Sequence, residues 1–495
     1  MSAPPAADPA SADTRRTLTG SLGVGSIVFM VVAAAAPLTV IAGTVPLGIA
    51  AGNGAAFPTT FALCCAILLL FAVGFCAMSR HVPEAGAFYS YVARGLGRAP
   101  GLGSAFLALV TYTAVQLAVY GYVGAVIDGL VQHWGGPELP WYVWSVVVLA
   151  VVGTLGYRHI ELSGRVLGVL LVAEVAIVLV FDAVVIGSGG GSAEGLSNTF
   201  LVPSQFVSGS LGIAIMFAIA SFIGFEATAV FRDEARDPQR TIPRATYTAL
   251  VLIGVFYTLS AWAVISAWGD TEAIAQAGAD PGNMIVTTIT NTLGPVGGDI
   301  AQVLLMTSLI AAILSFHNVL ARYFFALGNS GALPARCGRS HPRHASPHVA
   351  SLTQSVTALV FVAVFALAGL DPVTQVFAWM AGTATLGVLA LMALTCAAVL
   401  VFFREQRRRN ESRDRRSRVD TRLWHTLVAP ALGLVGLLVC LYLTVSNFTT
   451  LIGGSPVLAT GIGAVLVVAF VLGAVWSRRT PAPATPAVDP AVDQA

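Results

Sequence analysis

Two hydrophobic segments that are long enough to cross a membrane are interrupted by residues that break helices. They cover residues 29–50 and 212–231. The interrupting residues are Pro37, Gly43 and Pro46 in the first segment and Gly224 with Glu226 in the second. Proline removes a backbone donor and glycine permits unwound backbone, which is tolerated at membrane depth only where it lines a cavity or is buried in protein. Two broken spans at matching places in two halves of a chain indicate the binding site of a secondary transporter.

The composition is that of a helical membrane protein. The chain has 495 residues, of which 56% are hydrophobic and 10% are charged, whereas soluble proteins carry about 25% charged residues. Runs of about 20 apolar residues recur along the chain, and each predicts a membrane-spanning helix. The predicted spans are residues 24–50, 56–79, 101–131, 141–157, 163–187, 208–231, 243–268, 298–325, 348–369, 373–403, 424–446 and 455–477.

Arginine placement predicts the orientation of these twelve spans. All 26 basic residues are arginine, and they lie before the first span, after the last one and mostly in every second connecting loop. Because positively charged loops stay on the cytoplasmic side, both termini are predicted to be cytoplasmic, in the inner (cytoplasmic) membrane. The dense group from Arg404 to Arg422 is interpreted as an orientation signal that also contacts anionic membrane lipids.

The two broken spans lie five spans apart, and an odd offset inverts the second copy in the membrane. The sequence therefore predicts an all-α polytopic membrane protein with two inverted repeats of five helices and two additional helices. The predicted parts are a disordered tail (1–18), the first repeat (19–188), the second repeat (189–404), a basic cytoplasmic loop (405–423), the last two helices (424–478) and a second disordered tail (479–495).

Two carboxyl groups lie inside predicted spans, where ionisation is costly. Glu226 follows the break of the sixth span, and Glu174 lies in the fifth span. Each is interpreted as a proton-handling group, and the alternative is a neutral acid that is hydrogen-bonded within the packed protein. Asp182 lies nearer the outer end of the fifth span, which predicts an interfacial position. His317 is a lone histidine in the eighth span and is interpreted as structural.

Other features indicate neither a metal site nor an enzyme. The six cysteines, most of them inside apolar spans, form no CxxC motif and are interpreted as small packing residues. No pair of nucleophile and base, metal-binding cluster or phosphate-binding motif stands out, so no cofactor is expected. Tyr112 and Gln116 belong to a polar and aromatic stripe on the third span, which either packs or lines a vestibule.

The stretch from Ser221 to Tyr247 contains an aromatic residue, a glycine and a glutamate, followed by an acidic pair. Its C-terminal part contains two prolines. These residues are Phe222, Gly224, Glu226, Asp233, Glu234, Pro238, Pro243, Arg244 and Ala245. The stretch resembles the sixth-span signature of the amino acid–polyamine–organocation (APC) family of permeases. Residues 81–101 and 318–334 resemble the linker after the second span and the end of the eighth span in that family, so the resemblance covers nearly the whole chain.

The resemblance implies a LeuT-type fold in which unwound parts of spans one and six bind the α-carboxylate and α-amino groups of an amino acid. The corresponding residues are Ala36, Pro37, Leu38 and Thr39 in span one and Ala220, Ser221, Phe222, Ile223 and Gly224 in span six. Ala220 aligns with a tryptophan gate of one relative, which implies a wider pocket or a gate at Phe222 or Phe316. Glu174 aligns with a lysine of sodium-independent relatives. Because its charge has the opposite sign, what that lysine implies about sodium independence cannot be carried over to this chain.

The sequence thus predicts a permease that imports an amino acid by proton symport with alternating access. Glu226 is the preferred proton carrier and Glu174 the second. The alternatives are exchange of substrates and uptake of an amine such as ethanolamine or a polyamine. A transporter-like sensor is disfavoured because no long cytoplasmic domain is predicted.

Overall fold

The computed structural model of the protein describes residues 22–82, 88–158, 164–228, 235–341, 346–411 and 422–479. Within these ranges the chain is helical, apart from turns, loops and an isolated β-bridge between Leu22 and Ala235. Nearly all of the two predicted tails, most of the predicted basic loop, and Asp233 and Glu234 lie outside the described residues.

Each predicted span has a helical counterpart in the structure. The spans are formed by α1 (Val24–Ala35) with α2 (Pro37–Leu47), α3 (Phe57–Ser79), α5 (Arg98–His133), α6 (Trp141–Tyr157), α7 (Gly164–Gly187), α9 (Leu211–Ala220), α10 (Pro238–Trp268), α12 (Met284–Asn329), α13 (His348–Leu367), α14 (Ala378–Glu411), α15 (Ala429–Leu451) and α16 (Pro456–Trp476). Among the described residues, ten helical stretches are long and apolar enough to cross a membrane, and α1 and α6 are shorter apolar helices. The predicted all-helical polytopic membrane protein is confirmed.

Short helical elements connect or extend the spans. They are α4 (Phe88–Leu96), α8 (Pro203–Phe206), α11 (Asp270–Ala279), the π-helical turns η1 (Gly48–Asn53), η6 (Pro372–Phe377) and η8 (Trp424–Val428), and the 3-10 turns η2 (Gly54–Ala56), η3 (Thr199–Leu201) and η5 (Ala335–Gly338). Within α12, Gly294 has a φ of 81° and is followed by Pro295, so the helix bends before its membrane-spanning part.

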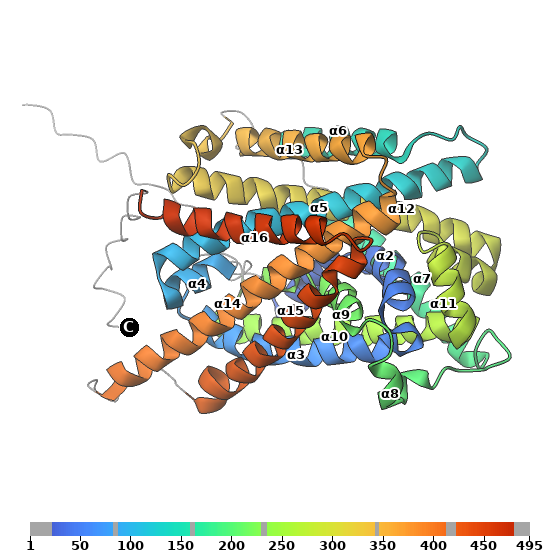
Figure 1. The fold of residues 1–495 in the computed structure, drawn as a ribbon, viewed down its shortest axis with the longest axis horizontal. Helices are drawn as coiled ribbons and strands as arrows, with labels where there is room; N and C mark the ends of the chain where they lie inside the picture. Colours follow the sequence, from blue (N-terminus) through green and yellow to red (C-terminus); the bar gives the residue numbers. More distant parts are fainter. Residues whose placement is uncertain are drawn as a thin grey trace, which may run out of the picture.

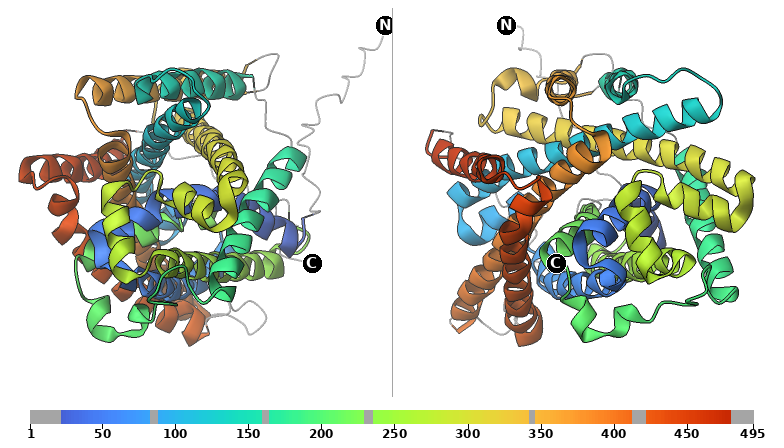
Figure 2. Two further views of the ribbon diagram at one scale, coloured as in Figure 1. Left: turned by 90° about the vertical axis from the view of Figure 1, so that its right-hand side faces the viewer. Right: turned by 45° about the vertical axis from the view of Figure 1, so that its right-hand side comes forward.

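The arrangement separates an interior from a lipid-facing periphery. Among the candidate spans, the region of α9 is the most buried and α16 the least. Figures 1 and 2 show α2 and α9 inside the bundle, whereas α6, α13 and α16 lie at its edge. Large exposed apolar side chains are frequent on α7, α13, α15 and α16. In a membrane protein such faces meet lipid, so the buried centre around α2 and α9 is where a binding site must lie.

The ends of the bundle differ in charge as the arginine pattern predicts. Figure 1 shows α4 and the C-terminal ends of α14 and α16 at one end, and α8 and α11 at the opposite end. Arginines of the first group include Arg94, Arg404 and Arg478, whereas α8 and α11 contain none. The described arginines of these segments therefore gather at one end of the bundle.

Two residues expected to interrupt the first span do not do so. Gly43 and Pro46 lie inside the continuous helix α2. A Cβ atom on Gly43 would come within 2.6 Å of the Phe377 ring, so the glycine serves close helix packing and not unwinding. Pro46 lies in the last turn of α2, and the π-helical turn η1 follows that helix.

Candidate functional site

The first span is broken at Ala36. Ala36 has a φ of 46°, the only positive φ outside glycine among the described residues. Pro37 causes the break because its ring has no N–H and clashes with the carbonyl oxygen four residues earlier. That oxygen, of Ala33, accepts a hydrogen bond from the Ala36 N–H at 3.2 Å instead. The left-handed conformation costs a non-glycine residue about 1–2 kcal/mol, and strain of this kind concentrates at functional sites.

The unwound stretch in this span is shorter than predicted. Pro37, Leu38 and Thr39 already belong to the first turn of α2, and Ala36 alone is non-helical. The first backbone N–H groups of a helix have no partner within it, and they form the positive end of its dipole. The break therefore places the positive end of a half-helix in the interior of the protein.

The sixth span is broken where the sequence predicts. Helix α9 ends at Ala220, and residues 221–224 form a turn. The Ile223 N–H donates to the Ala220 carbonyl oxygen at 3.2 Å, three residues earlier, so the regular helical ladder has ended. Gly224 has a φ of 113°, which side-chain-bearing residues rarely adopt. The carbonyl end of a half-helix, with its partial negative charge, thus lies across from the start of α2.

Hydroxyl groups connect the broken spans to each other and to the eighth span. The oxygens of Thr44 and Ser221 lie 2.9 Å apart and join α2 to the turn after α9. The Thr39 hydroxyl donates to Ser308 on α12 at 3.0 Å. These bonds tie α2 to the turn after α9, and the first turn of α2 to α12.

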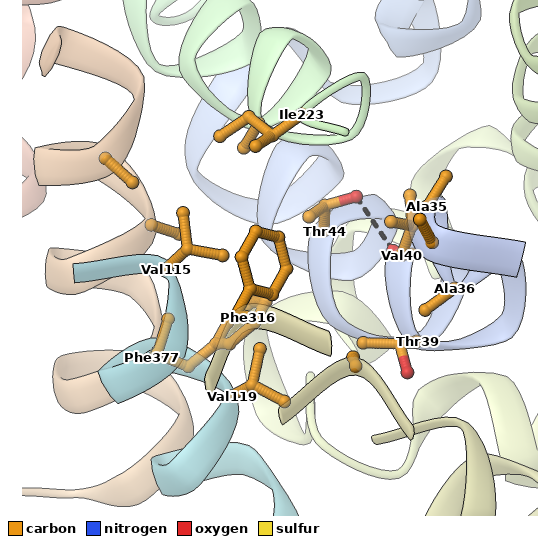
Figure 3. Close-up of a pocket in the computed structure, with 16 residues that line it drawn as sticks. Ala35, Ala36, Thr39, Val40, Thr44, Val115, Val119, Ile223, Phe316 and Phe377 are labelled. Atoms are coloured by element: carbon orange, nitrogen blue, oxygen red, sulfur yellow. Dashed lines mark hydrogen bonds between the residues drawn. The ribbon is translucent and has the colours of Figure 1, made fainter. Parts of the chain in front are cut away.

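A pocket lies between these broken spans and helices α5, α12 and α14. Its lining comprises Ala34, Ala35, Ala36, Thr39, Val40, Thr44, Val115, Ala118, Val119, Ala220, Ile223, Ala312, Phe316, Phe377, Ala381 and Ala384. Figure 3 shows Thr39, Val40 and Thr44 on one side and Val115 on the other. Two threonine hydroxyls are the only side-chain polar groups in the lining, and it has no charged side chain. The pocket therefore suits an apolar group whose charges are met by backbone.

The predicted site residues divide between this lining and the packing behind it. Ala36, Thr39, Ala220, Ile223 and Phe316 line the pocket, whereas Pro37, Leu38, Ser221, Phe222 and Gly224 do not. The ring of Phe222 packs against Phe61 and Tyr257, at centroid distances of 6.5 and 6.1 Å, on the far side of the turn. Of the two aromatic gate candidates, Phe316 is therefore the one at the pocket.

Gln116 lies apart from the pocket. Its side chain donates to the Ile313 carbonyl oxygen at 3.4 Å and accepts from the Gln354 amide. Phe377 was not among the predicted residues although it lines the pocket and packs against Gly43. It lies in η6, at the start of the tenth span, where no interrupted helix or intramembrane charge signals a binding role.

Glu226 stands directly behind the sixth-span turn and is buried. Its Oε1 accepts a hydrogen bond from the Tyr112 hydroxyl at 2.7 Å, and its Oε2 accepts one from the Gly224 N–H at 2.9 Å. The Tyr112 ring lies 6.2 Å from the ring of Phe316, which lines the pocket. Glu226 is thus in contact with both the hinge of span six and, through Tyr112, one wall of the pocket.

Glu174 on helix α7 lies outside the pocket lining, next to the first turn of α2. Its carboxyl group is buried and interacts with the Leu38 backbone N–H and the Ser308 hydroxyl. Its Oε2 has no hydrogen-bond partner among the described residues. A carboxyl group next to the first turn of α2 is favoured by the dipole of that half-helix. Glu174 therefore lies where span one resumes after its break.

Asp182 is buried and not interfacial as predicted. Only 1% of it is exposed, and its Oδ2 accepts a hydrogen bond from Ser260 on α10 at 2.8 Å. The prediction was wrong because α10 covers this face of α7, which the sequence of α7 does not reveal. His317 has the structural position predicted for it: it is buried, and its Nε2 lies 2.8 Å from the Ser351 hydroxyl.

A metal site is not found among the described residues. They contain no group of three or more histidine, cysteine, aspartate or glutamate side chains that could hold an ion. The cysteines are free, and five of the six are buried.

Comparison with known proteins gives a match over nearly the whole chain. Residues 26–486 match the family model described as "Amino acid permease". The chain is 26% identical over 286 residues to the "Aromatic amino acid transport protein AroP" of Escherichia coli O6:H1, covering 56% of this chain and 60% of that protein. It is 29% identical over 331 residues to an uncharacterized transporter of Mycobacterium bovis, covering 65% of this chain and 67% of that protein.

A third relative has a different kind of name. The "Low-affinity putrescine importer PlaP" of Escherichia coli K12 is 22% identical over 326 residues, covering 62% of this chain and 66% of that protein. The alignment with AroP covers 60% of that protein, so the rest of AroP has no counterpart in the alignment.

Proposed function

Because the chain belongs to the amino acid permease family, we propose that it imports an amino acid with an apolar side chain. The family assignment agrees with the prediction of a transporter and not an enzyme. The observation that carries the proposal is the lining of the pocket, which is apolar except for two threonine hydroxyls. A buried apolar surface is favourable for an apolar side chain and unfavourable for a free charge.

The two half-helix ends supply the charge recognition that the side chains lack. The backbone N–H groups at the start of α2 suit a carboxylate, and the carbonyl groups at the end of α9 suit an ammonium group. An amino acid carries both groups, whereas a diamine such as putrescine carries a second ammonium that would lie in the apolar part. The pocket therefore favours the substrate class named for AroP over that named for PlaP.

Uptake into proteoliposomes tests this proposal. We expect the purified protein to accumulate neutral amino acids with aliphatic or aromatic side chains and to ignore putrescine and ethanolamine at equal concentration. The pocket has no anionic side chain to pair with a second ammonium, and an unpaired buried charge costs several kcal/mol, on the order of a hundredfold or more in affinity. Preferential uptake of the amines would establish the alternative function.

We further propose that transport is proton symport with alternating access. Glu226 is the preferred proton carrier because each of its oxygens accepts a hydrogen bond from a segment that must move during transport. One segment is the Gly224 turn, and the other is the pocket wall, which is reached through Tyr112. Adding a proton converts an oxygen from an acceptor into a donor, so it weakens the bond from the Gly224 N–H. Protonation is thus linked to the conformation of span six.

Glu174 is proposed as the second proton carrier, acting next to the first turn of α2. Its carboxylate and the carboxylate of a bound amino acid both favour the positive end of α2. Like charges in a buried site repel one another, so a proton on Glu174 favours substrate binding. Substrate affinity should then rise as pH falls.

Replacing Glu174 with glutamine is expected to remove most of this pH dependence. The neutral amide no longer repels the substrate, so affinity at high pH should rise to within about tenfold of its low-pH value. Titration calorimetry between pH 5 and 8 measures this, since that range brackets the titration of perturbed carboxyl groups. The amino acid amide, which has no carboxylate, is the matched control between about pH 5 and 6.5, where its α-amino group stays protonated, and it should show no such pH dependence there. A pH profile identical to the wild type would rule out Glu174.

The remaining predictions about the chain as a whole are part of the same proposal. We propose an inner (cytoplasmic) membrane location with both termini on the cytoplasmic side, supported by the arginine-rich end of the bundle. We also propose the LeuT-type division into inverted repeats 19–188 and 189–404, supported by the matched breaks after Ala35 and Ala220. Protein partners are not implied, and contact with membrane lipids follows from the exposed apolar faces.

A further inference from the structure

A second cavity, of about 490 Å³, lies among the end of α3, the start of α10, the C-terminal part of α14 and η8. Its lining comprises Val73, Cys76, Ala77, Arg80, His81, Gln239, Pro243, Tyr247, Phe403, Arg422, His425 and Thr426. This basic cavity shares no lining residue with the pocket between the broken spans. Its volume is within the range of about 300–1,000 Å³ that is typical of small-molecule sites.

Contacts between distant helices hold the walls of the basic cavity in place. The lining residues of α10 recur at every fourth position, so they share one face of that helix. The Arg407 guanidinium on α14 donates to the Thr426 hydroxyl at 3.2 Å and so joins α14 to η8. The His81 ring packs against Phe402 and Phe403 of α14, at centroid distances of 5.4 and 5.8 Å. The cavity is therefore a packed feature of the fold.

The charged side chains in the lining are both arginines, Arg80 and Arg422. The imidazole rings of His81 and His425 add N–H groups that can donate hydrogen bonds. Helix α10 begins beside the cavity, with Gln239 in its first turn, and so contributes the positive end of its dipole. Guanidinium groups form strong hydrogen bonds to phosphate oxygens, so this lining suits a phosphate group.

Acidic residues of the flanking elements do not line the basic cavity. Among the described side chains they are Asp237, at the start of α10, and Glu405 on α14. The Asp237 carboxylate lies 3.8 Å from Nε of Arg240, and the Glu405 carboxylate pairs with Arg409. Each of these negative charges thus has an arginine partner outside the lining, and the lining itself is positive.

A partly exposed stripe on α3 runs to this cavity. Leu70, Val73, Ala77 and Arg80 recur three or four positions apart, and none of them is fully buried. Trp424 on η8, which is 52% exposed, marks the level of the lipid headgroups, where exposed tryptophan is enriched in membrane proteins. The cavity therefore lies at headgroup level on the arginine-rich side, and the apolar part of the stripe extends into the hydrocarbon region.

We propose that the basic cavity binds the headgroup of an anionic phospholipid. Its phosphate accepts hydrogen bonds from Arg80 and Arg422, and its acyl chains follow the stripe on α3. A basic cavity between spans on the cytoplasmic side suits such a headgroup. Because Arg80 follows the second span and Arg422 precedes the eleventh, a bound lipid joins these two parts of the bundle. The proposal requires only a membrane protein, so it does not depend on the substrate or on proton coupling.

Thermal unfolding of the full-length protein in a non-ionic detergent tests this site. A ligand that binds the folded state raises the unfolding temperature in a saturable way. We expect phosphatidylglycerol to do so, and the zwitterionic phosphatidylcholine, inorganic phosphate and glycerol 1-phosphate to have little effect. In Arg80→Gln and in Arg422→Gln, the concentration of phosphatidylglycerol at half of the full shift should rise about tenfold or more, because each variant loses hydrogen bonds to a charged group.

Two further variants separate the site from general effects of charge and of folding. Arg478→Gln removes an arginine at the same end of the bundle but outside the lining, and it should bind within about twofold of the wild type, because exposed charges are screened by salt. Ala77→Phe keeps both arginines and fills the cavity, so it should weaken binding as the arginine variants do. It decides the question if an arginine variant does not fold in phosphatidylcholine.

Four results would overturn the proposal. They are wild-type affinity in Ala77→Phe or in both arginine variants, equal weakening in Arg478→Gln, equal stabilisation by phosphatidylcholine, and equal stabilisation by glycerol 1-phosphate. Equal weakening in Arg478→Gln would indicate attraction to the whole basic end. Equal stabilisation by phosphatidylcholine would indicate recognition of acyl chains alone, and equal stabilisation by glycerol 1-phosphate would indicate a site for a soluble phosphate compound.

Discussion

Replacing Glu226 with glutamine is expected to abolish the acceleration of uptake by an inward proton gradient, while substrate binding stays within about tenfold, or about 1.4 kcal/mol, of the wild type. Glutamine has nearly the same shape as glutamic acid, so it can still accept from the Gly224 N–H and contact Tyr112. It cannot gain or lose a proton. The variant should therefore bind substrate and open to each side, but without a proton to bias the direction.

The measurement is the ratio of substrate accumulated with and without the pH gradient, in the absence of sodium. Tyr112→Phe is the control, because it removes the 2.7 Å hydrogen bond to Glu226 and keeps the carboxyl group. That variant should still respond to the gradient. Full gradient-driven accumulation in Glu226→Gln would rule out Glu226 as the proton carrier and leave Glu174 in that role. Uptake that requires sodium and does not depend on pH would refute proton coupling altogether.

The spans themselves were predictable because lipid imposes one requirement on all of them. Each needs about 20 apolar residues, and this composition is visible in any window of the sequence. The breaks were predictable where the cause is local. Pro37 and Gly224 act on the backbone within four residues of their own positions, so the sequence alone locates both breaks.

The predictions that failed depend on contacts between distant parts of the chain. Gly43 was interpreted as a break, yet it provides room for Phe377, which is more than 300 residues away. Asp182 was expected at the interface with water, yet Ser260 on α10 covers it. Phe377 itself was missed, because the sequence does not show whether an aromatic residue of a predicted span faces the pocket or another part of the protein. Periodicity identifies a helix, and the neighbouring helices decide which residues line the pocket.

Replacing Ala220 with tryptophan is expected to exclude bulky substrates while small ones are still transported. Ala220 ends α9 and lines the pocket together with Phe316 and Phe377. An indole at this position would fill the space between the end of α9 and the two aromatic rings, where the substrate side chain is proposed to lie. Each methylene group of substrate that no longer fits corresponds to about 1–3 kcal/mol of discrimination, so a large side chain should lose a hundredfold or more in uptake, by order of magnitude.

Initial uptake rates for alanine, valine, leucine and phenylalanine measure this loss against side-chain size. Ala220→Ser is the matched control, because it changes the polarity of the position with little change of volume, and it should transport all four. In the double variant Ala220→Trp with Phe316→Ala, the removed ring should return space to the pocket and restore part of the uptake of larger substrates. A uniform loss across all four amino acids would mean that Ala220 does not contact the substrate side chain, because a contact with the side chain must depend on its size.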